Sequence, residues 1–314
     1  MPVWLVTGGS GFVGRHLLDA LSAMRDIQPL AMGRRLPDGW PAGAFVPADL
    51  EEPESVARAI RATHPDVVIH AAGRTPPGEP GLFYRANTLT TLHMLDALRA
   101  ADAPVRLVLA GSAAELGPVA ETDLPVAEDH PCRPADAYGM SKWLSTCAGL
   151  STGPPLEVVV ARVFNPIGPG QPLNQAFGRF AARLNDRRAG PLSLVVGDLD
   201  ARRDFVDVRD ATRALVVLAE GGRGGRIYNV GTGMSHQVGD GLAHLIRRSG
   251  RMVEVRVDPG LTTNLGPRDS RADIRRIVAE TGWCPRIAWE QTLDDLWDEA
   301  ARRVGATRPL PLTA

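Results

Sequence analysis

A glycine-rich turn near the start of the chain, Thr7 to Gly14, constrains the fold more than any other stretch. It reads TGGSGFVG and joins an apolar, strand-like run to a helix-like run. Gly8 permits a tight turn, Gly11 lets the backbone approach a pyrophosphate, and Gly14 lets the helix pack close to the strand. The N–H groups and the positive dipole of the helix N-terminus suit phosphates. The turn therefore predicts a dinucleotide-binding unit rather than a plain βα turn.

Short apolar strands alternate with amphipathic helices through the first half of the chain. The expected strands are 3–7, 29–32, 46–47, 66–70, 105–110 and 157–162, and the expected helices are 14–25, 55–63, 82–101 and 138–150. Near-continuous apolar strands between helices are typical of a parallel sheet covered on both faces. The predicted fold class is therefore α/β, a doubly wound parallel sheet of the Rossmann type.

The pattern loosens after residue 165. The expected helices are 175–185, 208–220 and 238–249, with two more near the end, and the expected strands are 192–196, 226–230 and 253–257. Ligands of such sheets bind at the carboxyl ends of the strands. We therefore predict a Rossmann domain at 1–165, a smaller and mainly substrate-binding lobe at 166–304 that is partly interleaved with it, and a tail at 305–314.

Composition excludes several classes of function. The net charge is −1 and no long Lys/Arg run occurs, so we expect no nucleic-acid partner. No apolar run approaches the roughly 20 residues of a membrane span, so we expect no membrane partner. The three cysteines form no CxxC pair, which is typical of a reduced, cytoplasmic protein without a disulfide framework, and no metal site is expected.

A YxxxK pattern on the expected helix 138–150 carries chemistry. Tyr138 and Lys142 are four residues apart, which places both side chains on one helix face. A phenol with a pKa of about 10 is a poor acid–base group near neutral pH unless an ammonium favours its anion. Lys142 would do this and hold the nicotinamide ribose, while Tyr138 would donate a proton to a carbonyl oxygen.

The GxxGxxG spacing, with Phe12 after the second glycine, resembles the extended short-chain dehydrogenase/reductase family. Later turns agree with this resemblance. Asp49-Leu50 follows the third strand, His70-Ala71-Ala72-Gly73 ends the fourth, and Asn87 lies where the family braces the strands near the cofactor. The resemblance implies cofactor contacts from Gly8, Gly11, Phe12, Val13, Arg34, Asp49, Leu50, Ala71, Ala72, Tyr138 and Lys142.

The resemblance also implies a Ser–Tyr–Lys triad. Ser112 follows the fifth strand at the family's spacing from Tyr138, and it would hydrogen-bond the substrate oxygen. Ala113 and Ala114 stand where the family's 4,6-dehydratases carry an acid and a glutamate, which disfavours dehydration. Glu115, one place later, is expected to point elsewhere. No cysteine lies in this loop, which disfavours the epimerase-reductases that make fucose-type sugars.

The residues after the second expected strand bear on the choice of cofactor. NAD enzymes usually place a carboxylate there for the ribose 2′-OH, whereas this chain has Arg34-Arg35. An arginine can pair with a 2′-phosphate. The sequence thus favours NADP(H), with NAD(H) as the alternative, and a solvated arginine pair is the other interpretation of the two residues.

The lobe carries two stretches that resemble nucleotide-sugar contacts of the family. One is R-V-F-N-P-I-G-P-G, in which Asn165 would bind the diphosphate or sugar. The other spans 200–210, in which Arg203 would clamp the nucleotide. Arg268 matches a further phosphate contact, and Ser112 completes the predicted substrate residues. Asp207 is expected to cap the next helix, and Arg179 is as well explained by a surface position.

Within the family, the longer stretches are most similar to those of GDP-4-keto-6-deoxy-D-mannose reductases. This implies NADPH-dependent reduction of the C4 ketone of a nucleotide-diphospho-4-keto-6-deoxy sugar, giving GDP-D-rhamnose. An NAD-dependent nucleotide-sugar 4-epimerase uses the same triad and is the alternative enzyme. A non-catalytic NADP-sensing scaffold is a third interpretation, although such proteins typically lose the Tyr or the Lys. The family also implies a homodimer formed through helices near 84–101 and 138–150.

Overall fold

The computed structural model describes residues 1–186, 192–261 and 268–306. Its centre is a seven-stranded sheet in the order β11-β6-β5-β4-β1-β2-β3, and every neighbouring pair is parallel. The predicted α/β class is therefore confirmed. The strands are β1 (Val3–Thr7), β2 (Gln28–Gly33), β3 (Phe45–Pro47), β4 (Val67–His70), β5 (Val105–Ser112), β6 (Leu156–Val163) and β11 (Arg226–Val230).

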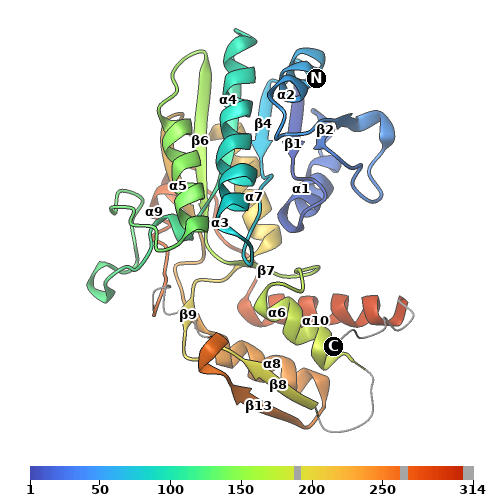
Figure 1. Cartoon of the computed structure of the whole chain (residues 1–314), viewed down its shortest axis with the longest axis vertical. Coiled ribbons are helices and arrows are strands. Elements are labelled where there is room, and N and C mark those ends of the chain that lie inside the picture. Colours follow the sequence, from blue (N-terminus) through green and yellow to red (C-terminus); the bar gives the residue numbers. More distant parts are fainter. Residues whose placement is uncertain (187–191, 262–267, 307–314) are drawn as a thin grey trace.

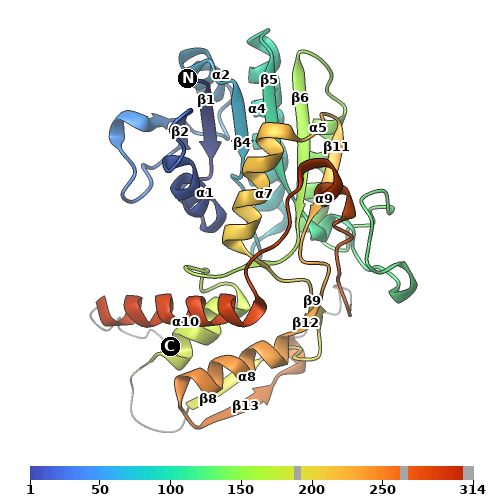
Figure 2. The same ribbon diagram turned by 180° about the vertical axis from the view of Figure 1, so that it is seen from behind.

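Helices cover both faces of this sheet. One face carries α2 (Pro53–Thr63), α4 (Thr90–Ala100) and α5 (Ala137–Leu150), which lie in front in Figure 1. The other carries α1 (Phe12–Ser22) and α7 (Val208–Gly221), which lie in front in Figure 2, with α9 (Arg275–Thr281) beside β11. No described helix is both long and apolar enough to cross a membrane.

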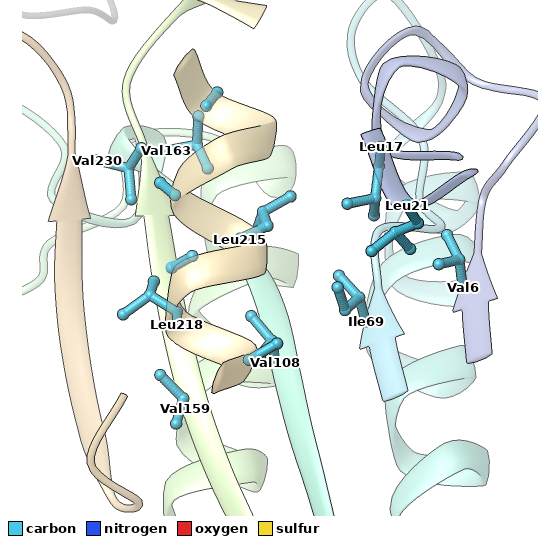
Figure 3. Close-up of a cluster of buried hydrophobic side chains, with 14 of the residues drawn as sticks. Val6, Leu17, Leu21, Ile69, Val108, Val159, Val163, Leu215, Leu218 and Val230 are labelled. Carbon is cyan, nitrogen blue, oxygen red and sulfur yellow. The ribbon is translucent and has the colours of Figure 1, made fainter. Parts of the chain in front are cut away.

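The two faces hold separate hydrophobic cores because successive residues of a strand point to opposite sides. On the α1/α7 side, buried strand residues meet helix residues such as Leu17 and Leu215 (Figure 3). On the other side, Leu5, Val68 and Leu107 pack beneath α2, α4 and α5. Each fully buried side chain of this kind contributes roughly 1.5–3 kcal/mol. These cores fix the height at which every strand ends.

A smaller lobe lies beyond the carboxyl ends of the strands (Figure 1). Its parallel pair β8 (Leu192–Val196) and β13 (Val253–Val257) packs with α6 (Ala176–Leu184), α8 (Val238–Ser249) and α10 (Trp289–Ala306). Short strand pairs connect it to the sheet: β7 (Pro166–Ile167) with β10 (Val206–Asp207), and β9 (Arg202–Arg203) with β12 (His236–Gln237). The chain returns to the sheet for α7, β11 and α9, so segments of the two parts alternate.

Some element boundaries differ from the sequence expectation. The helix expected at 82–101 is divided into α3 (Pro80–Phe83), a π-helical turn η2 (Tyr84–Leu89) and α4. α1 begins at Phe12 rather than at residue 14, because Gly11 already occupies the extended N-cap position. In α2, Pro53 takes the first turn, and the Ser55 hydroxyl accepts the Asp49 N–H at 3.0 Å instead of capping the helix.

The remaining short elements are 3₁₀ turns, namely η1 (Ala42–Ala44), η3 (Ala113–Glu115), η4 (Glu121–Asp123) and η5 (Pro259–Leu261). α10 continues to Ala306, past the expected start of a tail at 305. The rest of that expected tail, 307–314, lies outside the described residues.

Candidate active site

The glycine turn packs backbone directly against backbone. Gly8 has φ +77°, and its carbonyl accepts the Gly11 N–H at 2.9 Å. A Cβ on Gly14 would lie 2.0 Å from the same carbonyl oxygen, and one on Gly8 would lie 2.7 Å from the Ala72 nitrogen. Any side chain at either place would push the first helix from the first strand, or the turn from the loop after β4.

The N-terminus of α1 is open toward a ligand. Gly11 is exposed and provides no side-chain cap, so the first N–H groups of the helix, at Phe12 and Val13, have no capping acceptor among the described residues. A Cβ on Gly11 would meet only the Gly8 carbonyl, at 3.1 Å. Free N–H groups at a helix N-terminus beside an uncrowded glycine fit the pyrophosphate of a dinucleotide.

The other predicted cofactor residues lie along the same edge of the sheet. The Asp49 carboxylate accepts the Glu51 N–H at 3.0 Å, and the Leu50 carbonyl bonds to His93 Nδ1 at 2.9 Å, so this turn after β3 is held by its own contacts. Thr7 Oγ1 accepts the Ala72 N–H at 3.2 Å, which ties β1 to the loop containing Ala71.

Arg34 and Arg35 follow β2 and are exposed. Within the described ranges neither guanidinium has a hydrogen bond or an ion pair. An arginine pair without an internal partner has all its donors available to solvent or to an anion.

The predicted triad residues are brought together. Ser112 is the last residue of β5, and Tyr138 and Lys142 lie in the first turns of α5, which Asp136 caps by accepting the Gly139 N–H at 2.7 Å. The Ser112 hydroxyl lies close enough to the Tyr138 phenol to lower the pKa of that phenol. Lys142 Nζ donates to the Ala110 carbonyl on the same strand. This arrangement offers a polarising hydroxyl, an acid and a nearby cation in one place.

Burial controls the protonation of this group. Desolvation raises the pKa of Tyr138, and the charges of Glu115 and Asp136 raise it further, while the Ser112 hydrogen bond opposes the shift. Desolvation lowers the pKa of Lys142, and the Glu115 charge opposes that shift. Tyr138 is consequently a protonated phenol near neutral pH, which is the form that can donate a proton to a carbonyl oxygen.

His70 is a buried residue close to Lys142 of the triad. From the sequence it was identified only as the end of the fourth strand. Its Nδ1 bonds to Thr7 Oγ1 at 2.9 Å, and its Nε2 has no partner in the described part of the chain. Burial, together with the charge of Lys142, lowers the pKa of His70 to about 3. The imidazole is therefore neutral at physiological pH and adds no second positive charge beside Lys142.

Asn87 ties the loop after β4 to α5. Its Oδ1 accepts the Arg74 N–H at 2.7 Å, and its Nδ2 donates to Ser141 Oγ at 2.8 Å. A Cβ on Gly73 would lie 2.7 Å from that Oδ1, so this approach needs the glycine. The residue expected to brace strands thus holds the loop and the triad helix at a fixed distance.

Glu115 points elsewhere, as expected, but its carboxylate is bonded to the turn that carries Ser112. Its side chain is fully buried, Oε1 accepts the Ser112 N–H at 2.7 Å, and Oε2 lies 3.2 Å from Arg162 Nε. The cause is local, because the 3₁₀ turn η3 folds the chain back at Ser112 in a capping box. The S-x-x-E pattern is a capping-box signature and was the available signal.

The predicted substrate residues lie in the segments that join the sheet to the lobe. Asn165 follows β6 with φ +25°, and its Nδ2 donates to the Asp204 carbonyl at 3.0 Å. Arg203 lies half-buried on β9 and donates to the Arg202 carbonyl at 2.8 Å; desolvation lowers its pKa. The Arg268 side chain is exposed, and its carbonyl accepts the Arg202 N–H at 2.9 Å. Arg203 and Arg268 thus belong to neighbouring segments, while Gly266-Pro267 lies outside the described residues.

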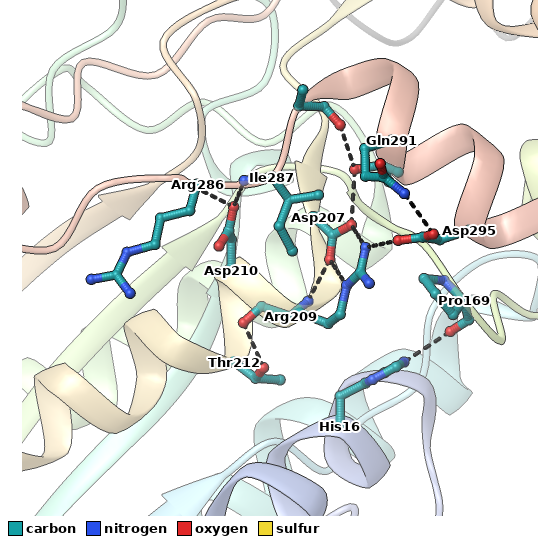
Figure 4. A network of polar contacts seen from close by, with 12 residues as sticks. His16, Pro169, Asp207, Arg209, Asp210, Thr212, Arg286, Ile287, Gln291 and Asp295 are labelled. Carbon is teal, nitrogen blue, oxygen red and sulfur yellow. Dashed lines mark hydrogen bonds and ion pairs between the residues drawn. The ribbon is translucent and has the colours of Figure 1, made fainter.

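Asp207 caps α7, as expected, by accepting the Arg209 N–H at 2.8 Å. The same carboxylate binds the Arg209 guanidinium and accepts the Thr292 hydroxyl at 2.8 Å, so it also connects α7 to α10 (Figure 4). Arg179 on α6 is exposed, in line with a surface position.

Two residues of α1 that the sequence did not single out fasten the lobe to the cofactor helix. His16 Nε2 bonds to the Pro169 carbonyl at 2.8 Å (Figure 4), and Arg15 donates to the Gly170 carbonyl. The Gly170 N–H in turn donates to Glu299 of α10 at 3.0 Å. The turn after Asn165 is therefore held between α1 and α10.

The fold and the site together define a Rossmann-type dinucleotide-binding protein with a Ser–Tyr–Lys group at the carboxyl edge of its sheet. The profile of the NAD dependent epimerase/dehydratase family matches residues 4–231, and the chain belongs to this family. The family resemblance predicted from the motifs is thereby confirmed.

Named relatives are similar over nearly the whole chain. GDP-6-deoxy-D-mannose reductase from Pseudomonas aeruginosa is 33% identical, with 95% of this chain and 97% of that protein covered. The dTDP-6-deoxy-L-talose 4-dehydrogenase (NAD(P)(+)) of Kitasatospora kifunensis is 31% identical over 93% of each. UDP-glucose 4-epimerase of Azospirillum brasilense is 30% identical over 97% of each.

Solved structures agree in fold. RMD from Pseudomonas aeruginosa complexed with NADPH has a TM-score of 0.84 at 30% identity, covering 96% of this chain and all of that one (100%). The UDP-glucose 4-epimerase of Thermus thermophilus in complex with NAD has a TM-score of 0.81 at 28% identity, covering 95% and 98%.

Replacing Gly14 with alanine should destabilise the protein and remove its dinucleotide site. The added Cβ would lie 2.0 Å from a backbone oxygen that cannot rotate away. Overpacking of this kind costs about 1–3 kcal/mol, and the helix N-terminus would shift with it. Thermal unfolding and fluorescence titration with NADPH check both effects. Gly43→Ala is the control, because a Cβ there would meet no atom within 4 Å; equal behaviour of the two variants would contradict the prediction.

Proposed function

We propose that this chain is an NADP(H)-dependent reductase of the C4 ketone of a nucleotide-diphospho-4-keto-6-deoxy sugar. GDP-4-keto-6-deoxy-D-mannose is the favoured substrate, and GDP-D-rhamnose is its product. The observation that carries the proposal is the convergence of Ser112, Tyr138 and Lys142 at the carboxyl edge of the sheet, where β5 ends and α5 begins. The near full-length similarity to GDP-6-deoxy-D-mannose reductase supports the choice of sugar.

Three side chains perform the reduction in this proposal. When bound, the nicotinamide supplies the hydride to C4. Ser112 donates a hydrogen bond to the ketone oxygen and holds it in place. Tyr138 transfers its phenolic proton to that oxygen as the ketone becomes an alcohol, and the Lys142 ammonium stabilises the phenolate that remains. Solvent then returns a proton to Tyr138.

The proposed cofactor residues all lie along the carboxyl edge of the sheet. Gly8, Gly11, Phe12 and Val13 surround the open helix N-terminus that suits the pyrophosphate. Asp49 and Leu50 would contact the adenine, and Ala71 and Ala72 leave room for the dinucleotide. The exposed Arg34, without an internal partner, would bind the 2′-phosphate, which is why NADP(H) is favoured over NAD(H).

The substrate would lie between the sheet and the lobe. Asn165, Arg203 and Arg268 come from segments that meet at this junction, and guanidinium groups suit a diphosphate. In this assignment residues 1–165 bind the cofactor, and residues 166–304 mainly bind the nucleotide sugar.

A nucleotide-sugar 4-epimerase is the second candidate. The 30% identity to UDP-glucose 4-epimerase over nearly the whole chain favours it, because both reactions need the same three side chains. The two differ in cofactor retention, since an epimerase keeps its NAD through the reaction. Purified protein that carries NAD(H) would support the epimerase and reject the reductase.

A cytoplasmic homodimer completes the proposal. Several large apolar side chains are exposed on η2, α4 and α5, namely Leu89, Leu92, Met140 and Leu144. α5 packs against η2 and α4, so the elements that carry these residues lie together on one face of the sheet (Figure 1). A second copy that buries this face would remove the apolar surface from water. The three cysteines are free, as suits a reducing compartment.

Tyr138→Phe should abolish turnover while cofactor binding persists. Loss of a general acid lowers the rate by about 10²–10⁴-fold. The removed hydroxyl lies on α5 and not at the N-terminus of α1, so the proposed pyrophosphate site is kept. The test is a panel of 4-keto-6-deoxy GDP-, dTDP-, UDP- and CDP-sugars, monitored by NADPH and NADH oxidation. Tyr84→Phe serves as the control. Unchanged turnover of Tyr138→Phe on every sugar would reject the mechanism and revive a non-catalytic role.

Arg34→Ala should weaken NADPH binding and leave NADH binding unchanged. A charge-assisted hydrogen bond to the 2′-phosphate is worth about 1.5–3 kcal/mol, which corresponds to roughly 10–100-fold in Kd. Arg25→Ala, another exposed arginine, is the control. Fluorescence titration with both cofactors measures the effect, and equal losses for NADPH and NADH would contradict it.

The double variant Leu92→Glu/Leu144→Glu should be monomeric at concentrations at which the unaltered chain is a dimer. Two carboxylates buried in an apolar interface would each lose several kcal/mol of hydration. Leu173→Glu, at an exposed leucine outside these helices, should leave the mass unchanged. Light scattering decides the matter, and a monomeric mass for the unaltered chain at about 100 μM would reject the dimer.

A further inference from the structure

The carboxylate of Glu115 is built into the turn that carries Ser112. Its Oε1 accepts the Ser112 backbone N–H at 2.7 Å, and the Ser112 hydroxyl accepts the Ala114 N–H at 3.2 Å. The two bonds close a reciprocal capping box around η3. The side chain of Glu115 is fully buried, so its carboxylate is shielded from water. The turn at Ser112 therefore depends on this one carboxylate.

A buried arginine opposes Glu115. Arg162 on β6 is also fully buried, and its Nε lies 3.2 Å from Glu115 Oε2. Its other donors reach the Glu128 carbonyl at 3.3 Å and Cys132 Sγ at 3.2 Å, both without formal negative charge. A guanidinium does not lose its proton in proteins. Desolvation raises the pKa of Glu115, whereas Arg162 and the Ser112 N–H oppose that shift. Because an uncompensated buried cation is costly, we assign Glu115 as the counter-charge of Arg162.

The turn that Glu115 closes, η3, lies against the backbone that holds the other two triad residues. Glu115 Oε1 would be 2.6 Å from a Cβ on Gly111, the residue after the Ala110 carbonyl that Lys142 binds. On the helix side, a Cβ on Gly139, next to Tyr138, would lie 2.4 Å from the Ala114 carbonyl. η3 is thus pressed against both β5 and the first turn of α5.

We propose that Glu115 is a positioning residue of this site: its carboxylate fixes the turn that carries Ser112 and places one buried negative charge beside Tyr138 and Lys142. The inference rests on the proposed reductase function, because it assigns a role in the same proton transfer. Glu115 touches neither the ketone nor the cofactor in this assignment and acts through Ser112 and through its charge.

The charge has a defined effect on the proton donor. The groups that face Glu115 are Arg162 from β6, Lys142 and Cys147 from α5, Cys132 from the loop after η4, and Tyr138. The negative charge raises the pKa of Tyr138, since a second negative charge on the phenolate is disfavoured nearby. Removing the charge lowers that pKa. Reduction needs protonated Tyr138, so activity would then be lost at a lower pH.

Glu115→Gln tests this directly. The amide oxygen can still accept the Ser112 N–H, whereas the charge is gone. We expect kcat to fall about tenfold and the alkaline inflection of kcat/KM to move to lower pH by about half a unit or more. The KM of the sugar and the Kd of NADPH should change less than about threefold, because Glu115 itself contacts neither ligand and the amide keeps its bond to Ser112.

Asp210→Asn is the matched control. Asp210 is an equally buried carboxylate that accepts the Arg286 and Ile287 N–H groups and pairs with Arg213, but it lies on α7, away from the triad. This variant should lose thermal stability with kcat and the pH profile unchanged. If Glu115→Gln behaves in the same way, its role is structural only and the proposal is overturned.

A second variant guards against misfolding. Glu115→Leu/Arg162→Met removes both charges with similar volume, an exchange that often leaves stability intact or improved. We expect a folded protein that keeps the lowered kcat and the shifted pH profile. A folded double variant with the kcat and pH profile of the unaltered chain would overturn the proposal.

A measurement without substrate separates this inference from the proposed function. Ultraviolet absorbance reports phenol ionisation, and subtracting the matching Tyr138→Phe protein isolates Tyr138. If the unaltered chain reduces no sugar of the panel, the reductase proposal fails. The titration still tests whether the Glu115 charge lies close enough to Tyr138 to raise the pKa of its phenol. A Tyr138 titration at lower pH in Glu115→Gln supports the inference; a fall in kcat without a shift in either pH measurement overturns it.

Discussion

The distance between β1 and α1 is the constraint on which the rest of the structure depends. It is set by the contact between the backbone of Gly14 and the Gly8 carbonyl, which leaves no room for a Cβ on Gly14. Because α1 starts so close to the strand, its N–H groups point across the carboxyl edge of the sheet. The same placement brings Arg15 and His16, one turn further on, to the carbonyls at 169–170. The phosphate site and the attachment of the lobe therefore share one cause.

Strand register brings the polar residues to this edge. Thr7 pairs with His70, His70 pairs with Leu109, and Ser112 pairs with Val163. β5 consequently runs three residues beyond its partner β4, to Ser112. The main chain after β4 turns away at Ala71, and its small side chains leave space beside the projecting end of β5. In a parallel sheet this step is the natural place for a ligand, because on the β4 side no strand pairs with the last three residues of β5.

Much of the fold could be predicted because its strands are rich in apolar and β-branched residues and its helices show apolar residues on one face. Strands 192–196, 226–230 and 253–257 and the helix 238–249 were predicted with the observed bounds. The π-helical turn at 84–89 was not predicted. A π-helical turn contains one residue more than an α-helical turn, and this leaves the apolar spacing of the helix almost unchanged. The ion pair of Glu115 was missed for another reason. Its ion-pair partner Arg162 is 47 residues away, and only the fold shows that β5 and β6 are neighbours.

The proposed choice of sugar depends on the segments that join the sheet to the lobe. One buried carboxylate organises the junction: Asp204 accepts N–H groups from Thr232, Gly233 and Ala272, at 2.7, 2.9 and 3.0 Å. Desolvation raises the pKa of Asp204, and these hydrogen bonds oppose the shift. Asp204 thus joins its own segment to 232–233 and to Ala272. Because Arg203 precedes it in sequence, these contacts also fix the backbone of Arg203, the proposed nucleotide clamp. The segments proposed to recognise the substrate are thus joined to the triad edge through their backbone N–H groups, and these contacts do not depend on which side chains the segments carry.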